Sequence, residues 1–206
     1  VADCHRATMT RMDEPLPQAA NAEQVIAATR AWLEKAVIGL NLCPFAKAVH
    51  TKGQVRYVVS GATTPEALLA ELEDELQHLA ATDPQATDTT LLIHPGVLQD
   101  FLDFNDFLAP ADALLERLGL DGTLQIASFH PRFQFAGTEA DDISNFTNRA
   151  PCPTLHLLRE DSIDRAVEAF PEAEAIYERN IETLERLGRD GWQALFAKSP
   201  RGPTGS

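Results

Sequence analysis

The sequence predicts a single α/β domain: a small, mainly parallel or mixed sheet of three to four strands, flanked by helices and followed by a helical C-terminal tail. Three observations support this fold class. Segments rich in β-formers alternate with amphipathic helical segments of crossover length, which favours parallel pairing through right-handed connections. A chain of 206 residues suits one domain better than two. Its composition, 44% hydrophobic and 23% charged, is typical of globular proteins.

The first helix is predicted over residues 21–40, where apolar side chains recur at helical spacing. Asn21 and Gln24, three residues apart, are typical of a capping box at its start. Pro44 disfavours helix beyond it and biases the preceding Cys43 toward an extended backbone. We therefore expect Cys43 to lie at a turn, where its side chain can face a cleft.

Two strand-helix units follow. Strands are predicted at residues 54–60 and 88–94, which are rich in β-branched and aliphatic residues. Each precedes a helical region, at residues 64–81 and 97–118. We expect Pro110 to divide the second region into two helices, because proline lacks the N–H that continues a helix.

A third strand, residues 123–129, completes a β-α-β-α-β succession, and residues 155–158 add a fourth short strand. The segment between them, residues 131–153, is longer than most connections within a compact domain. The three phenylalanines of this segment favour an ordered loop with a function. Helical segments between residues 163 and 196 form the C-terminal tail.

The expected organisation is a flexible N-terminal extension at residues 1–20, one α/β domain at residues 21–197 and a disordered tail at residues 198–206. Pro15 and Pro17 disfavour a helix in the extension, which also lacks the apolar core of a signal peptide. The last residues, rich in Gly, Pro and Ser, have little to pack.

The charge balance and the cysteines indicate a soluble, acidic, cytoplasmic protein. Lys and Arg number 17 against 31 Asp and Glu, so the net charge of −14 disfavours nucleic acid as a partner. No stretch approaches the roughly 18 unbroken apolar residues of a membrane span, which disfavours a membrane partner as well. The three cysteines, Cys4, Cys43 and Cys152, are an odd number, which fits free thiols in a reducing compartment.

Two histidines mark the ends of predicted strands. His94 and His130 are each followed by proline at the carboxyl end of a strand, which is where ligands gather in open α/β sheets. Two imidazoles at one rim can act as acid and base, or can bind a divalent transition metal together with His156 or Cys43. Alternatively, each histidine simply fills a turn at its strand end.

Further candidate groups surround this rim. Cys43 is a candidate nucleophile or redox thiol, with a buried, inert cysteine as the alternative. Asn145, Asn148 and Arg149 in the long loop can orient a substrate, and the arginine can bind a carboxylate or phosphate. Arg159, directly after the fourth strand, lines the same rim or forms an ordinary surface ion pair.

Several common signatures are absent from the sequence. It contains no G-x-x-x-x-G-K-[ST] phosphate loop, no G-x-G-x-x-G fingerprint, no G-x-S-x-G elbow and no C-x-x-C pair. The common classes of nucleotide-binding protein, hydrolase and zinc-ribbon protein are therefore disfavoured.

Four long motifs carry a family resemblance: GLNLCPFAKAV, LQIASFHPRFQFAG, DDISNFTNRAPCPTLHLLRE and AIYERNIETLERLG. Together they closely resemble the family called domain of unknown function 1415, over about Glu23 to Leu195. The resemblance implies a stand-alone domain and no known activity. Cys152 departs from it, because an aromatic residue is expected there, which leaves Cys43 as the thiol of interest. The family motifs fall on Asn41, Cys43, Pro44, Phe45, His130, Pro131, Gln134, Asn145, Asn148, Arg149, Pro151 and His156.

Three hypotheses of function follow. The first is an enzyme acting on a small polar or anionic metabolite, with Cys43 as nucleophile or redox thiol and His130 as acid or base. Its substrate-binding residues would be Asn41, Gln134, Asn145, Asn148, Arg149 and Arg159. The second is a metal-binding protein that uses His94, His130, His156 or Cys43. The third is a non-catalytic interaction module whose long loop is a docking surface; a wide separation of Cys43 from His130 favours it most.

Overall fold

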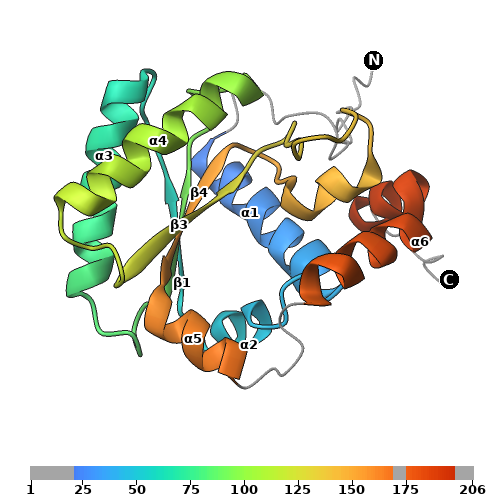
Figure 1. Ribbon diagram of the computed structural model, residues 1–206, viewed down its shortest axis with the longest axis horizontal. Helices are drawn as coiled ribbons and strands as arrows, with labels where there is room; N and C mark the ends of the chain where they lie inside the picture. Colours follow the sequence, from blue (N-terminus) through green and yellow to red (C-terminus); the bar gives the residue numbers. More distant parts are fainter. Residues whose placement is uncertain (1–20, 169–174, 198–206) are drawn as a thin grey trace, which may run out of the picture.

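A four-stranded mixed sheet forms the centre of the protein in the computed structural model, which describes residues 21–168 and 175–197 (Figure 1). The strand order is β1-β2-β4-β3, and β4 runs antiparallel to both of its neighbours, whereas β1 and β2 are parallel. The predicted α/β class with a mixed sheet is confirmed. The strands are β1 (Val55–Val59), β2 (Thr89–Ile93), β3 (Leu124–Phe129) and β4 (Thr154–Arg159).

The position of β4 was not predicted, since the helical crossovers suggested parallel pairing, which β1 and β2 show, whereas β3 pairs with β4 in antiparallel register. The chain instead returns after β3 and inserts β4 between β2 and β3. Burial explains the order, because Leu155 and Leu157 of β4 are fully buried, while β3 carries the exposed Gln125 and suits an edge.

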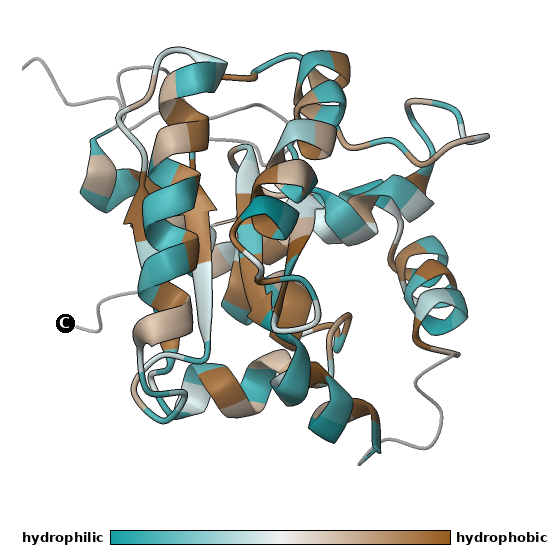
Figure 2. Ribbon diagram, turned by 60° about the vertical axis from the view of Figure 1, so that its left-hand side comes forward, coloured by the Kyte–Doolittle hydropathy of each residue, from teal (hydrophilic) through white to brown (hydrophobic). Residues whose placement is uncertain are grey.

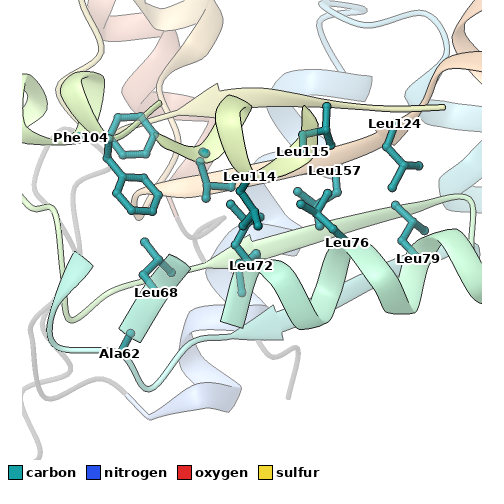
Figure 3. Close-up of a cluster of buried hydrophobic side chains, with 14 of the residues drawn as sticks. Ala62, Leu68, Leu72, Leu76, Leu79, Phe104, Leu114, Leu115, Leu124 and Leu157 are labelled. Atoms are coloured by element: carbon teal, nitrogen blue, oxygen red, sulfur yellow. The ribbon is translucent and has the colours of Figure 1, made fainter. Parts of the chain in front are cut away.

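Helices α3 (Pro65–Ala81) and α4 (Phe101–Arg117) cover one face of the sheet (Figure 1). Their leucines meet those of β3 and β4 in the main core (Figure 3). Leu68, Leu72, Leu76 and Leu79 form one stripe along α3, and all four are fully buried. Figure 2 shows the strands coloured mainly as hydrophobic, as expected for a sheet with helices on both sides.

The other face is covered only in part by α1 (Ala22–Trp32), which packs on β1 and β2. A π-helical turn, η1 (Leu33–Ile38), continues α1 and contacts α6 (Ile176–Phe196) and the short α2 (Ala46–Thr51). Helix α5 (Glu160–Glu168) directly follows β4. Within residues 21–168 and 175–197, no helix packs over β3 and β4 on this face in the way that α3 and α4 close the opposite face.

Pro110 does not divide the second helical region, so that expectation is wrong. Helix α4 runs through Pro110 without interruption. The proline is exposed, so water can satisfy the carbonyl that loses its partner. Phe104 and Phe107 before it and Ala111 and Leu114 after it are buried in the core, which holds both halves on the sheet.

The remaining elements largely follow the prediction. Asn21 and Gln24 form the capping box of α1. The long loop is ordered and contains a 3₁₀ helix, η2 (Ile143–Asn148), and the tail is helical, with a kink at Gly188 in α6. The expected terminal segments at residues 1–20 and 198–206 lie outside the described residues, as does part of the helix predicted from residue 163. Among the described helices, none has the length and apolarity to cross a membrane.

Candidate functional site

The strand rim brings His94 and His130 to the same aromatic ring. Both stack on Phe104 of α4, with ring centroids 5.6 Å and 5.2 Å away, and both imidazoles are fully buried. Burial lowers the pKa of each to about 4, so both are neutral at physiological pH.

One ring nitrogen of each histidine holds the loop between β2 and α4, whereas Nε2 of His94 is buried without a hydrogen-bond partner among the described residues. His94 Nδ1 donates to the carbonyl of Val97 over 3.1 Å, and His130 Nε2 donates to that of Leu98 over 3.3 Å. His130 Nδ1 accepts from the backbone N–H of Arg132, so both nitrogens of His130 are occupied. Leu98 has a φ of 56°, a conformation that this anchoring stabilises. The geometry gives the two histidines a structural role at the rim.

The three histidines do not form a metal centre. His156 lies in the middle of β4, beside Leu91 and Ala127, and its side chain is on the sheet face opposite to His94 and His130. Over residues 21–168 and 175–197, no group of three or more His, Cys, Asp or Glu side chains is placed to hold a metal ion.

Cys43 and His130 are also on opposite faces of the sheet, so the anticipated nucleophile and base do not meet. Side chains alternate along β3: Phe129 faces η1, whereas His130 packs against α4. Cys43 packs in the same apolar cluster as Phe129. Cys43 and His130 therefore cannot act together as nucleophile and base, as the first hypothesis expected.

The polar side chains of the long loop mostly hold the loop itself. Asn145, fully buried, accepts from Phe135 N–H and Thr138 Oγ1 at 2.9 Å each, and donates to the carbonyl of Glu139 over 2.8 Å. Asn148 donates to Ser128 O, and Gln134 to Thr138 O.

Arg149 is a further support of the loop. It donates to the carbonyls of Phe133 and Ala140, and its guanidinium lies 4.3 Å from the ring centroid of Phe146. These contacts fit the interpretation that the polar residues keep the loop in shape. They also occupy Arg149 donors that a substrate carboxylate would need.

Arg159 and Asn41 do not line the rim. Because β4 is antiparallel to its neighbours, Arg159 lies at the opposite end of the sheet, which corrects the prediction for this residue. It donates to the carbonyls of Leu79 and Thr82 over 2.6 and 2.7 Å. Asn41 is exposed at a φ of 56°, a left-handed backbone that asparagine tolerates well.

A cavity of about 1030 Å³ lies on the less covered face of the sheet, over β3 and β4. Helix α2, η1 and α5 form its other walls, and the starts of β1 and β2 lie at one end. Its lining is mainly apolar and includes Trp32, Leu33, Val37, Phe45, Val55, Leu91, Phe129 and Leu158. Trp32 and Phe129 meet edge to face, with centroids 5.1 Å apart. The charged residues Lys52, Asp88, Arg159, Asp161 and Arg165 also border it.

A polar pair, Thr89 and His156, lies on the sheet wall of this mainly apolar cavity. Thr89 Oγ1 of β2 is 2.6 Å from His156 Nε2 of β4 and 2.6 Å from the carbonyl oxygen of Leu157. The His156 ring is 6.0 Å from that of Phe129. Burial lowers the pKa of His156 to about 4, so the ring is neutral at physiological pH.

Cys43 borders the same cavity, on the turn before α2. Burial raises the pKa of its thiol, and the backbone N–H groups of Phe45 and Ala46 offset this increase only in part. Cys152 lies elsewhere, in the cluster under α1, and burial raises the pKa of its thiol to about 11. The structure thus places Cys43 with His156 in one cavity and apart from His130.

Thr89 was missed by the sequence analysis, and His156 was considered only as a metal ligand. No local pattern marks them, because the pair exists only through the antiparallel register of β2 with β4. Phe129 was treated as an ordinary strand residue. An available signal was the polar His156 between the leucines of β4, Leu155 and Leu157, because a buried polar side chain needs a hydrogen-bond partner.

Comparison with known proteins gives a family and no named activity. No curated protein matches the sequence, and no solved structure does. The family model described as protein of unknown function (DUF1415) matches residues 24–194, which is most of the chain, and the protein therefore belongs to this family, as its motifs indicate.

Proposed function

We propose that the protein binds a small, mainly apolar molecule in the cavity over β3 and β4. The observation that carries this proposal is a cavity of about 1030 Å³ whose lining is mainly apolar and includes the hydrogen-bonded pair of His156 and Thr89. Ligand sites typically combine a largely hydrophobic concave surface with a few placed polar groups, at volumes of roughly 300–1,000 Å³.

The way the cavity is built supports the proposal. Trp32, Phe45 and Phe129 come from separate parts of the chain and present aromatic surface to one space. Leaving such surface uncovered by packed side chains forgoes roughly 25 cal/mol per Å² of apolar area, a loss that an apolar ligand reverses. The π-helical turn η1, which supplies Leu33 and Val37, is of a kind that often occurs at functional sites.

The proposal changes both the place and the polarity expected from the sequence. The strand rim was expected to bind a polar or anionic metabolite, but His130 has both ring nitrogens in hydrogen bonds to the backbone. Asn145 and Arg149 are likewise committed to carbonyls and N–H groups of the loop. The less covered face, with its apolar lining, suits an apolar ligand better.

The test is to fill the cavity and measure binding of an apolar probe, 2-methoxynaphthalene, by calorimetry and ligand-observed NMR. Ala127 of β3 lines the cavity, so Ala127→Phe is expected to weaken binding at least tenfold without a loss of folding. The matched control is Ala113→Phe on the exposed side of α4, which should bind as the wild type does. No binding to the wild type, or equal binding to both variants, would contradict the proposal.

A thiol enzyme is a second candidate, because Cys43 borders the cavity that holds His156. A bound substrate would then meet a thiol and a neutral imidazole on the same side of the sheet. The raised pKa of Cys43 means that the free protein carries the thiol rather than the thiolate at neutral pH. Catalysis therefore requires a base that acts on Cys43 when the ligand is bound, and His156 is the imidazole that shares the cavity.

A further inference from the structure

The geometry points to a ligand that carries a hydrogen-bond donor on its apolar body, such as a hydroxyl or N–H group, which Nδ1 of His156 accepts. This inference rests on the proposed function and specifies the class of molecule that the cavity takes. It depends on which nitrogen of His156 carries the proton, and the contacts of Thr89 decide that.

The Thr89 hydroxyl has a single proton and two close neighbours. It lies 2.6 Å from the carbonyl oxygen of Leu157, which can only accept, so the hydroxyl donates there. It is also 2.6 Å from His156 Nε2, and toward that nitrogen it must then accept. The Nε2 atom of His156 therefore carries a proton, and Thr89 acts as a positioning residue.

The other nitrogen of His156 is consequently an acceptor. A neutral imidazole has one N–H, and Thr89 places it on Nε2, which leaves the Nδ1 lone pair bare. Within the described part of the chain, the hydrogen-bonding partner of the His156 ring is Thr89 alone. Since His156 lines the cavity, a bound ligand can approach Nδ1.

An acceptor at the wall of an apolar cavity selects its ligands. A molecule that covers Nδ1 without donating to it removes water from a lone pair and leaves it unsatisfied, which weakens binding. A molecule of the same shape with a donor at that point regains the hydrogen bond. Phe129, whose ring is 6.0 Å from that of His156, offers apolar surface for the adjoining part of the ligand.

The test compares 2-naphthol, which carries a hydroxyl, with 2-methoxynaphthalene, which has the same rings and no donor. The wild type is expected to bind 2-naphthol about 2- to 10-fold more tightly, the range of one neutral hydrogen bond. In His156→Phe both probes should still bind, and the preference should disappear. The matched control is His78→Phe on the exposed side of α3, which should keep the preference.

The outcomes separate the two proposals. If neither probe binds the wild type, the proposed function fails; if both bind equally well, the binding site stands and the inference about Nδ1 is overturned.

Because His156→Phe can perturb folding, nitrogen NMR of the wild type gives an independent measurement. It should show a proton on His156 Nε2 and none on Nδ1, and Thr89→Val should abolish this fixed tautomer. A wild-type protein with the proton on Nδ1 would overturn the inference.

Discussion

At the scale of single residues, Cys43 shows how burial governs the chemistry of a thiol. Its side chain is partly buried beside apolar groups, which disfavours the charged thiolate and raises the pKa. Two backbone N–H groups near the sulfur act in the opposite direction but do not outweigh burial. Since the thiolate is the reactive species, the geometry makes Cys43 a slow nucleophile in the free protein.

We predict that iodoacetamide at pH 7 modifies Cys43 more slowly than it modifies a small free thiol. Cys152 should react more slowly still, because it is 3% exposed and its pKa is raised to about 11. Peptide mapping by mass spectrometry of the folded protein gives both rates, and unfolded protein provides the control in which the two converge. If Cys43 reacts faster than the free thiol, it is activated, and the thiol-enzyme candidate gains over simple ligand binding.

The sequence could nominate Cys43, His130 and Asn145 but could not tell which of them meet. Such nominations depend on residue type and local position, for example a histidine and a proline at a strand end. Which face of the sheet a side chain occupies depends on the register of β3, and the partner of His156 depends on the pairing of β2 with β4. For this reason the residues of the cavity came from the structure.

At the scale of elements, the loop of residues 131–153 is held by its own polar side chains. Asn145 alone satisfies two donors and one acceptor of the loop from a fully buried position. Phe133 and Phe135 meet edge to face at 4.9 Å, and Phe146 packs on Trp192 of α6 at 5.2 Å. The three phenylalanines that favoured an ordered loop in the sequence are the ones that anchor it.

We predict that Asn145→Ala lowers the free energy of unfolding by about 2–4 kcal/mol, because it leaves buried polar groups of the loop without partners. Urea unfolding measures the change. The control on the same loop is Asp141→Ala, whose side chain is 85% exposed and pairs with Arg189 at 4.0 Å, and which should change stability by less than about 0.5 kcal/mol. A stable Asn145→Ala protein that loses binding of the apolar probe would instead return Asn145 to the ligand site.

The elements themselves were largely predictable, since most follow local patterns. Helical spacing of leucines located α3, and the capping box located the start of α1. The short helix α2 was not predicted, and two further differences have non-local causes. Helix α4 continues through Pro110 because tertiary packing holds both halves, and β4 enters the middle of the sheet because its leucines are buried.

At the scale of the whole molecule, three neutral histidines are built into the two faces of the sheet. His94 and His130 are fully buried on the α4 side, and His156 lies on the cavity side. Burial lowers the pKa of each from 6.5 to about 4. In the unfolded chain the same rings take up protons near pH 6.5, so protonation favours the unfolded state.

We therefore predict that the protein loses stability as the pH falls from about 6.5 toward 4, and that its stability is nearly constant from pH 7 to 8. A folded pKa below the unfolded one means that the contribution is complete above pH 6.5 and is lost as protons bind. For His94 and His130 the shift from 6.5 to about 4 corresponds to about 3 kcal/mol each at most. Urea unfolding at pH 7.5, 6.5, 5.5 and 5 measures the effect above the range in which most carboxylates titrate.

His78→Phe, which removes an exposed histidine, should leave the profile unchanged. A stability that stays flat down to pH 5 would mean that the rim histidines accept protons in the folded state, which would reopen the strand rim as a site for acid–base chemistry.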